Sequence, residues 1–211
     1  MSETIRLTLI TPVVANPAAF RPALEAALVA RSIASVHLRL AAKEERDRER
    51  CIQALGPVIQ SQGAALIIDP PADLREVARW GADGVHVTTS AAMQEALQAL
   101  KPDRIVGVGA LRSRDAAMNA GEAGCDYVLF GEPRADGTLP PAEQVIERCE
   151  WWAQVFTTPC IGYAATPAMV RGLAGTGIEF VALGDWAFNG SAAEVTAAIH
   201  AAQQDLLVSQ A

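Results

Sequence analysis

The sequence predicts an α/β fold, a closed (β/α)8 TIM barrel that forms a single domain over residues 1–211. Short apolar runs rich in β-branched residues recur about every 25 residues, a spacing typical of alternating strands and helices. The runs are almost continuously apolar, as in Ala64–Asp69 and Ile105–Ala110, which indicates strands buried on both faces of a parallel sheet. Eight such units in 211 residues leave room for little beyond a closed barrel.

The eight runs are the predicted strands, and an open doubly wound sheet is the alternative arrangement. An open sheet of that kind usually carries a G-x-G-x-x-G turn after its first strand, whereas the turn here, Thr11–Pro17, contains no glycine. The closed barrel is therefore favoured. In chain order the predicted strands are Ile5–Ile10, Ser35–Leu40, Ala64–Asp69, Gly84–Thr88, Ile105–Ala110, Asp126–Gly131, Cys160–Tyr163 and Phe180–Gly184.

Helix signals fill the segments between these runs. Residues 22–31 are rich in Ala and Leu, and residues 44–62 begin as a charged run that carries an apolar face. Asp73–Glu76 and Ser191–Glu194 have the form of capping boxes, and Thr166 places a capping residue before a first-turn proline. Left-handed C-caps are expected at the glycines between a helix and the next strand, Gly63, Gly81, Gly124 and Gly177.

The composition excludes several classes of protein. Lys and Arg number 17 and Asp and Glu 24, so the net charge is −7, which argues against a nucleic-acid partner that needs a basic face. A small phosphorylated ligand stays compatible, because a few local cations can hold one. Hydrophobic residues make up 51% of the chain, which excludes disorder. No apolar stretch approaches the roughly 18 residues of a membrane span, so no membrane partner is expected.

The ends of the chain and its cysteines complete this picture. The start, Met1–Thr4, lacks the basic and apolar regions of a signal peptide, so a cytoplasmic location is expected. Residues 205–211 are expected to fray. The cysteines form no C-x-x-C pair and are expected to be reduced and to pack as small hydrophobic residues; they are Cys51, Cys125, Cys149 and Cys160.

The candidate site lies where the strands end, because barrels of this class work at the carboxyl ends of their strands. His37 and Arg39 end the second predicted strand and alternate onto the same side, so both could face an anionic ligand. The alternatives are a hydrogen-bonded barrel histidine at position 37 and an ion pair between Arg39 and Asp69. An unpaired guanidinium inside a barrel would be very costly, so Arg39 needs a partner.

Other strand ends add polar candidates. His86 ends the fourth strand and is predicted to contact a ligand or carry a proton, or else to bond a neighbouring backbone group. Asp69 is a weak candidate for Mg²⁺, since this ion usually needs one or two carboxylates together with phosphate oxygens. Glu132 and Asp185 are further carboxylates, but their strands lie farther around the ring. Arg134, in the loop after the sixth strand, either clamps a phosphate or is solvated.

Six segments of the chain form an informative ordered set: Thr8–Pro12, Val36–Arg39, Ala64–Asp69, Gly81–His86, Ile105–Ala110 and Gly124–Gly131. In this order they resemble the thiamine-phosphate synthase/TenI family, and the similarity runs over nearly the whole chain. The resemblance implies a (β/α)8 barrel that takes small phosphorylated heterocycles. It implies that hydroxymethylpyrimidine pyrophosphate and thiazole phosphate are joined, with release of pyrophosphate and help from Mg²⁺, in thiamine biosynthesis.

The resemblance also assigns roles to individual residues. It implies catalytic roles for Arg39, His37 and His86, and a Mg²⁺ ligand at Asp69. It implies substrate contacts at Arg39, Arg134, Gly109, Ala164, Ala165, Gly184 and Asp185.

Several positions depart from the family pattern. The Gln-x-Arg-x-Lys of the second strand is His37, Arg39 and Ala41 here, so only the arginine matches. The serine of the fifth strand is Gly109, and the Gly-Gly pair of the seventh strand is replaced by two alanines. These departures predict weak or lost synthase activity. A non-catalytic ligand-binding or regulatory module on the same barrel, and a TenI-like isomerase that uses His37 or His86, are the alternatives, and a homodimer is left open.

Overall fold

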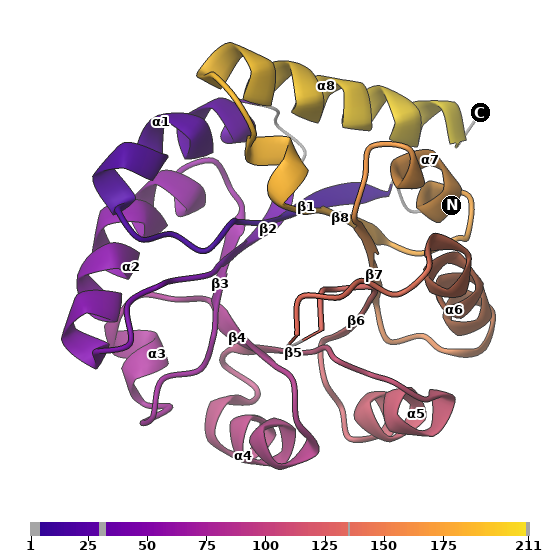
Figure 1. The fold of residues 1–211 in the computed structure, drawn as a ribbon. Helices are drawn as coiled ribbons and strands as arrows, with labels where there is room; N and C mark the ends of the chain where they lie inside the picture. Colours follow the sequence, from indigo (N-terminus) through magenta and orange to yellow (C-terminus); the bar gives the residue numbers. More distant parts are fainter. Residues whose placement is uncertain (1–4, 30–32, 135, 210–211) are drawn as a thin grey trace.

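The computed structural model describes residues 5–29, 33–134 and 136–209, and its strands close into a ring surrounded by helices (Figure 1). All eight neighbouring pairs of strands are parallel, and β1 pairs with β8 to close the barrel. The predicted fold class is therefore confirmed. The strands are β1 Arg6–Ile10, β2 Ile33–Leu38, β3 Ala65–Ile68, β4 Gly84–Val87, β5 Ile105–Val108, β6 Tyr127–Phe130, β7 Cys160–Ala164 and β8 Phe180–Leu183.

Each predicted strand overlaps an observed one, and β2 shows the largest shift. It begins at Ile33 and ends at Leu38, two residues before the predicted end. Leu40 instead forms an isolated parallel bridge with Val14, beyond the end of β1. The segments that follow β1 and β2 therefore pair once more, at this bridge.

Helices separate the strands and cover the outside of the barrel (Figure 1). Among the described residues the helices are α1 Pro17–Leu28, α2 Glu45–Gln60, α3 Glu76–Arg79, α4 Ser90–Leu100, α5 Arg114–Glu122, α6 Ala142–Val155, α7 Met169–Ala174, the 3-10 helix η1 Asp185–Phe188 and α8 Ala192–Ser209. Helix α8 continues through residues 205–209, where fraying was expected, and residues 210 and 211 lie outside the described part. Leu206 of this stretch is buried.

The start of α1 was predicted too late. Asn16 caps the helix, with its Oδ1 accepting the Ala19 N–H at 3.1 Å, and Pro17 occupies the first turn. Proline is favoured there because the backbone N–H groups of the first turn have no acceptor within the helix, so its lack of an N–H loses no hydrogen bond. The predicted end at Arg31 lies outside the described residues.

The predicted capping signals had different outcomes. The Ser191 capping box is confirmed, because the Ser191 N–H donates to Glu194 Oε2 at 2.7 Å and the Glu194 N–H donates back to Ser191 Oγ at 3.4 Å. The box at Asp73 is wrong: Asp73 Oδ1 accepts the Arg75 N–H at 3.0 Å, and α3 begins only at Glu76. The Glu76 carboxylate binds Arg79 instead.

The cap predicted at Thr166 is also wrong. Helix α7 begins three residues later, at Met169, with Ala168 in the N-cap position. The backbone carbonyl of Thr166, rather than its side chain, accepts the Met169 N–H at 3.1 Å. By contrast, the four glycines expected to adopt left-handed conformations do so, with φ between 78° and 89° at Gly63, Gly81, Gly124 and Gly177.

The apolar core has two layers. The larger lies between the helices and the outside of the barrel, and the four cysteines are free and buried. The smaller lies inside the barrel and consists of Ile10, Tyr127, Leu129, Ile161, Tyr163 and Ala182. Within the described part, no helix is both long and apolar enough to cross a membrane.

Candidate active site at the barrel mouth

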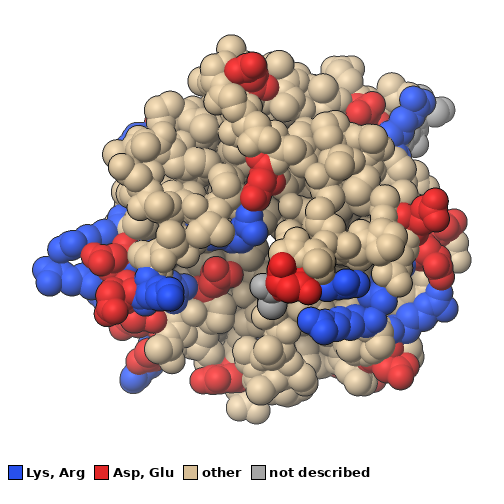
Figure 2. All heavy atoms as spheres, viewed as in Figure 1, with Lys and Arg blue, Asp and Glu red and all other residues tan. Residues whose placement is uncertain are grey.

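A cavity of about 800 Å³ opens at the carboxyl ends of the strands. It is lined mainly by the ends of β2 to β6 and the loops after them. In Figure 2, acidic and basic side chains gather around the hollowed centre of this face and toward its two sides, and fewer lie in its upper part. The polar residues that line the cavity include His37, Arg39, Asp69, His86, Glu132 and Arg134.

His37 is held by a carboxylate on the neighbouring strand. Its Nε2 lies 3.0 Å from Asp69 Oδ1, and the His37 side chain is 10% exposed. Burial lowers the pKa of His37, and this outweighs the opposing effect of the hydrogen bond to Asp69. Burial alone would raise the pKa of Asp69, but the His37 hydrogen bond and nearby positive charge lower it overall. Asp69 is therefore an ionised acceptor, and the His37 Nε2 carries the proton between them.

His86 is held on both sides. Its Nε2 lies 3.1 Å from Glu132 Oε2, and its Nδ1 lies 3.0 Å from the Tyr127 hydroxyl. Burial opposes ionisation of Glu132, but the hydrogen bond and charge of His86 lower the Glu132 pKa overall. Burial also raises the pKa of Tyr127, so this phenol keeps its proton. Glu132 thus accepts the Nε2 proton, and the Tyr127 hydroxyl donates to Nδ1 when His86 is neutral.

The two imidazoles lie against each other inside the mouth. Their ring centroids are 4.9 Å apart with the planes at 46°. Three of their four ring nitrogens have hydrogen-bond partners, whereas His37 Nδ1 is buried without one among the described residues. With Nε2 protonated and the pKa lowered, this Nδ1 carries a free lone pair. It is the one imidazole nitrogen of the pair that can accept a proton without first losing a protein partner.

Glycine at position 109 allows Glu132 to reach His86. A side chain here would overlap the Glu132 carboxylate and would lie 2.5 Å from His86 Nε2. The next residue, Ala110, has φ of 52°, and its N–H donates to Glu132 Oε1. Glu132 therefore reaches across the end of β5 to His86 on β4, although their strands are not adjacent. The expectation that Glu132 is remote does not apply to His86.

Arg39 is fixed by two other loops. Its Nε donates to the Thr11 carbonyl at 2.6 Å, and its backbone N–H donates to Thr11 Oγ1 at 3.0 Å. Its guanidinium also pairs with Asp185, after β8, rather than with Asp69. The alternation predicted for His37 and Arg39 is confirmed, since both line the cavity. The ion pair considered for Arg39 exists, but with a different carboxylate.

The side of the mouth formed by β7 and β8 is closed. The Trp186 indole N–H donates to the Ala164 carbonyl at 2.8 Å, and Ala164 is fully buried. A side chain at Gly184 would overlap the Tyr163 hydroxyl. Substrate contacts were expected at Ala164, Ala165, Gly184 and Asp185, and none of these residues is in the cavity lining, although Asp185 pairs with Arg39, which is.

The side of the mouth formed by the loops after β5 and β6 carries arginines. Arg134 is exposed, and its Nη1 donates to Thr138 Oγ1 at 3.4 Å within its own loop. Arg148 of α6 donates to the Leu111 and Arg112 carbonyls, each at 2.7 Å. These arginines line a cavity that also contains the carboxylates of Asp69, Glu132 and Asp136, so an anionic ligand would meet cations mainly on this side.

A family profile of thiamine monophosphate synthases matches residues 7–185, which is most of the barrel. The chain belongs to the thiamine monophosphate synthase family. A thiamine-phosphate synthase of Rhodospirillum centenum is 40% identical over 158 residues, covering 74% of this chain and 75% of that relative. One from Hyphomonas neptunium is 35% identical over 206 residues, covering 91% of each chain.

A solved structure shows the same architecture. A thiamine phosphate pyrophosphorylase from Pyrococcus furiosus superposes with a TM-score of 0.77 and covers 100% of this chain and 99% of its own. The two sequences are 17% identical, so this likeness supports the fold alone.

The donor set at the mouth does not fit the Mg²⁺ that the family implies. Asp69 uses Oδ1 to hold His37, and Glu132 uses both oxygens, for His86 and Ala110. No group of three or more His, Cys, Asp or Glu side chains in the described ranges is arranged to hold a metal ion. Mg²⁺ is usually bound through one or two carboxylates with phosphate oxygens, and here one oxygen of Asp69 and both oxygens of Glu132 are hydrogen-bonded within the protein.

Sequence reasoning missed Tyr127 and the contact between Glu132 and His86. Tyr127 could have been found from strand alternation, since Tyr127 and Leu129 occupy alternate positions of β6 and both belong to the core inside the barrel. The contact between Glu132 and His86 depends on the absence of a side chain at Gly109, which no local signal reveals.

Proposed function

We propose that the protein acts in thiamine biosynthesis as a thiamine-phosphate synthase-like protein that binds a phosphorylated heterocycle in the mouth of its barrel. The observation that carries this proposal is the cavity itself, which combines two imidazole–carboxylate pairs with arginines at the carboxyl ends of the strands. This face is where barrels of this class bind their ligands. Family membership supports the choice of a thiazole phosphate or a pyrimidine pyrophosphate as the ligand.

The arginines would hold the phosphate. Arg134 is exposed at the cavity edge, and among the described residues its side chain makes one hydrogen bond, of 3.4 Å, so its donors can turn to a ligand. Arg39 is 22% exposed and already neutralised by Asp185, so it would have to exchange that partner for the ligand's oxygens. A guanidinium binds a phosphate through paired N–H donors, which suits this role.

The condensing activity is expected to be weak. The two carboxylates hold imidazoles instead of a metal ion, and alanines stand at the seventh-strand positions where the resemblance placed a Gly-Gly pair. Loss of one such transition-state contact commonly costs about 2.7 kcal/mol or more, equivalent to roughly a 100-fold lower rate. We therefore propose that ligand binding by this chain does not require Mg²⁺.

A second candidate function is proton transfer on the bound heterocycle, as in a TenI-like isomerase. The place of His37 in the cavity lining favours it. Its Nδ1 has no partner among the described residues and could accept a proton once the bound heterocycle displaces the atoms that bury it, while Nε2 stays bonded to Asp69. His86, whose ring lies tilted beside it, would then orient the ligand or return the proton. A His37→Asn variant should lose this activity and still bind the ligand.

Calorimetry with thiazole phosphate and with pyrimidine pyrophosphate, in EDTA and in Mg²⁺, tests the proposal together with a coupled assay for thiamine phosphate. We expect saturable binding of at least one ligand in EDTA and a rate of condensation about 100-fold or more below that of an active relative. Tight binding without any turnover would favour the ligand-binding module. No binding of either ligand would overturn the proposal.

A further inference from the structure

Arg48 lies outside the cavity but reaches the loop that carries Asp69. From α2, its Nη2 donates to the Asp69 carbonyl at 2.6 Å and its Nη1 to the Pro70 carbonyl at 3.2 Å. The Arg48 side chain is 13% exposed, and it is not among the residues that line the cavity. A single guanidinium therefore joins an outer helix to two successive carbonyls at the end of β3.

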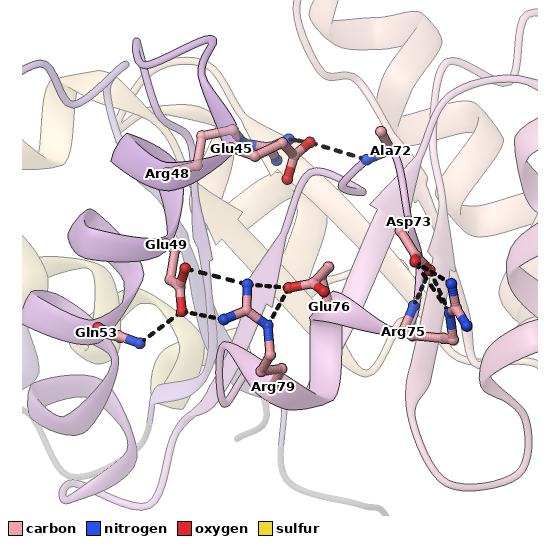
Figure 3. Close-up of polar contacts among 9 residues, drawn as sticks. All are labelled: Glu45, Arg48, Glu49, Gln53, Ala72, Asp73, Arg75, Glu76 and Arg79. Carbon is pink, nitrogen blue, oxygen red and sulfur yellow. Dashed lines mark hydrogen bonds and ion pairs between the residues drawn. The ribbon is translucent and has the colours of Figure 1, made fainter.

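Neighbouring groups hold Arg48 in this position. Glu45, one turn earlier on α2, lies 3.6 Å from Arg48 Nη1 and also accepts the Ala72 N–H at 3.0 Å (Figure 3). The Arg48 guanidinium lies 5.6 Å from the ring centroid of Trp80, which is buried. The loop is thus attached to α2 at three places, through Asp69, Pro70 and Ala72.

This loop depends on such side-chain contacts. Pro70 and Pro71 have no N–H groups, so they cannot donate backbone hydrogen bonds that would fix the loop. The Asp69 side chain is 52% exposed, so packing alone does not fix the carboxylate. The two hydrogen bonds from Arg48 restrain the backbone from which this carboxylate extends to His37.

We infer that Arg48 is a positioning residue: by holding the Asp69 and Pro70 carbonyls, it places the Asp69 carboxylate at hydrogen-bond distance from His37 Nε2. The hydrogen bonds from Arg48 to these carbonyls, and from His37 to Asp69, form without any ligand. The importance of Arg48 for catalysis rests on the proposed function, because only a working site makes the position of His37 matter.

The other imidazole–carboxylate pair has a similar support. Arg148 of α6 donates to two successive carbonyls, Leu111 and Arg112, in the loop after β5. The residue before them, Ala110, donates to Glu132, which holds His86. An arginine on an outer helix therefore restrains the loop next to each pair. This recurrence supports a positioning role independently of the contacts of Arg48.

Imidazole ¹⁵N NMR at fixed pH in EDTA, with no substrate present, tests the inference. Arg48→Met should shift the His37 Nε2 resonance toward that of a free imidazole and leave His86 nearly unchanged. Arg48→Lys, which can still donate to one carbonyl, should give an intermediate shift. Arg50→Met is the matched control on the same helix, because Arg50 is exposed and pairs only with Asp47 among the described contacts.

The kinetic arm uses whichever thiamine-related reaction the wild-type protein performs. Arg48→Met should lower kcat about tenfold with little change in KM, because a misplacement of about 1 Å can cost up to 100-fold. Circular dichroism checks that each variant is folded, and Arg48→Lys serves if the methionine variant is not. An unchanged His37 resonance in a folded Arg48 variant overturns the inference. A shifted resonance in a protein that binds no thiamine-related ligand would sustain it and refute the proposed function instead.

Discussion

At the scale of single residues, the buried imidazole of His37 makes stability depend on pH. The unfolded chain takes up a proton here near pH 6.5, whereas burial lowers the pKa in the folded protein. Below pH 6.5 the unfolded state therefore holds more protons, and the free energy of unfolding falls as the pH decreases. Asp69 and Glu132 have lowered pKa values, so they stay ionised through this range and do not cause this slope.

A His37→Gln variant tests this directly. We expect the wild-type protein to lose stability between pH 7 and pH 5 and the variant to lose less, as measured by urea unfolding at several pH values. His200→Gln is the control, because His200 is exposed on α8. Equal slopes in the wild-type protein and His37→Gln would contradict the assignment of this pH dependence to His37.

Gly109 gives a second prediction at this scale. A methyl group at position 109 would overlap Glu132 and press on His86, so Gly109→Ala should destabilise the protein by about 1–3 kcal/mol and separate that pair. Gly175→Ala is the control, since its new methyl group would lie 3.5 Å from the nearest atom, an ordinary contact. Thermal unfolding of the two variants measures their loss of stability. Equal destabilisation of the two variants would show that the space at Gly109 is not critical.

At the scale of elements, helix α6 should stabilise the loop after β5, which belongs to the preceding strand–helix unit. Arg148→Met removes two hydrogen bonds from α6 to the loop after β5, and charged hydrogen bonds contribute about 1.5–3 kcal/mol. We expect a loss of that order and faster hydrogen exchange at residues 110–113. Arg21→Met is the control, because the exposed Arg21–Glu25 pair on α1 contributes only about 0.3–0.5 kcal/mol. Unchanged exchange in the loop would contradict this.

The elements themselves could be predicted because their signals are local. Continuous apolar runs such as Ile105–Val108 mark buried strands, and each predicted run overlaps an observed strand. Helix starts were less certain, because a capping motif is also compatible with a turn. Asp73 bonds the N–H two residues later, as in a turn, and so the helix begins only at Glu76.

The site could be predicted only in part. Alternation along β2 placed His37 and Arg39 on the cavity side, and the end of β3 placed Asp69 nearby. The partner of Arg39 could not be predicted, because Asp185 is 146 residues away in sequence and reaches Arg39 only when β8 closes against β1. Long-range partners of this kind follow from barrel closure, whereas local patterns fix only the direction of each side chain.

At the scale of the whole molecule, closure of the barrel produces an uneven mouth. Tyr163 and Trp186 occupy the side formed by β7 and β8, while polar residues and the cavity lie toward β2 to β6. A ligand that binds only the folded barrel stabilises all of it, by about 2.7 kcal/mol at 100 times its Kd. We expect thiazole phosphate or pyrimidine pyrophosphate to raise the Tm in EDTA, and Mg²⁺ alone to leave it unchanged. A rise with Mg²⁺ alone would contradict the reading of the donor set.

An NMR titration of the metal-free protein with thiazole phosphate shows whether the polar mouth of this barrel binds a phosphorylated heterocycle. We expect saturable shifts of the His37 and His86 imidazoles together with the guanidinium of Arg134. Resonances that stay in place at saturating ligand would refute binding at the mouth.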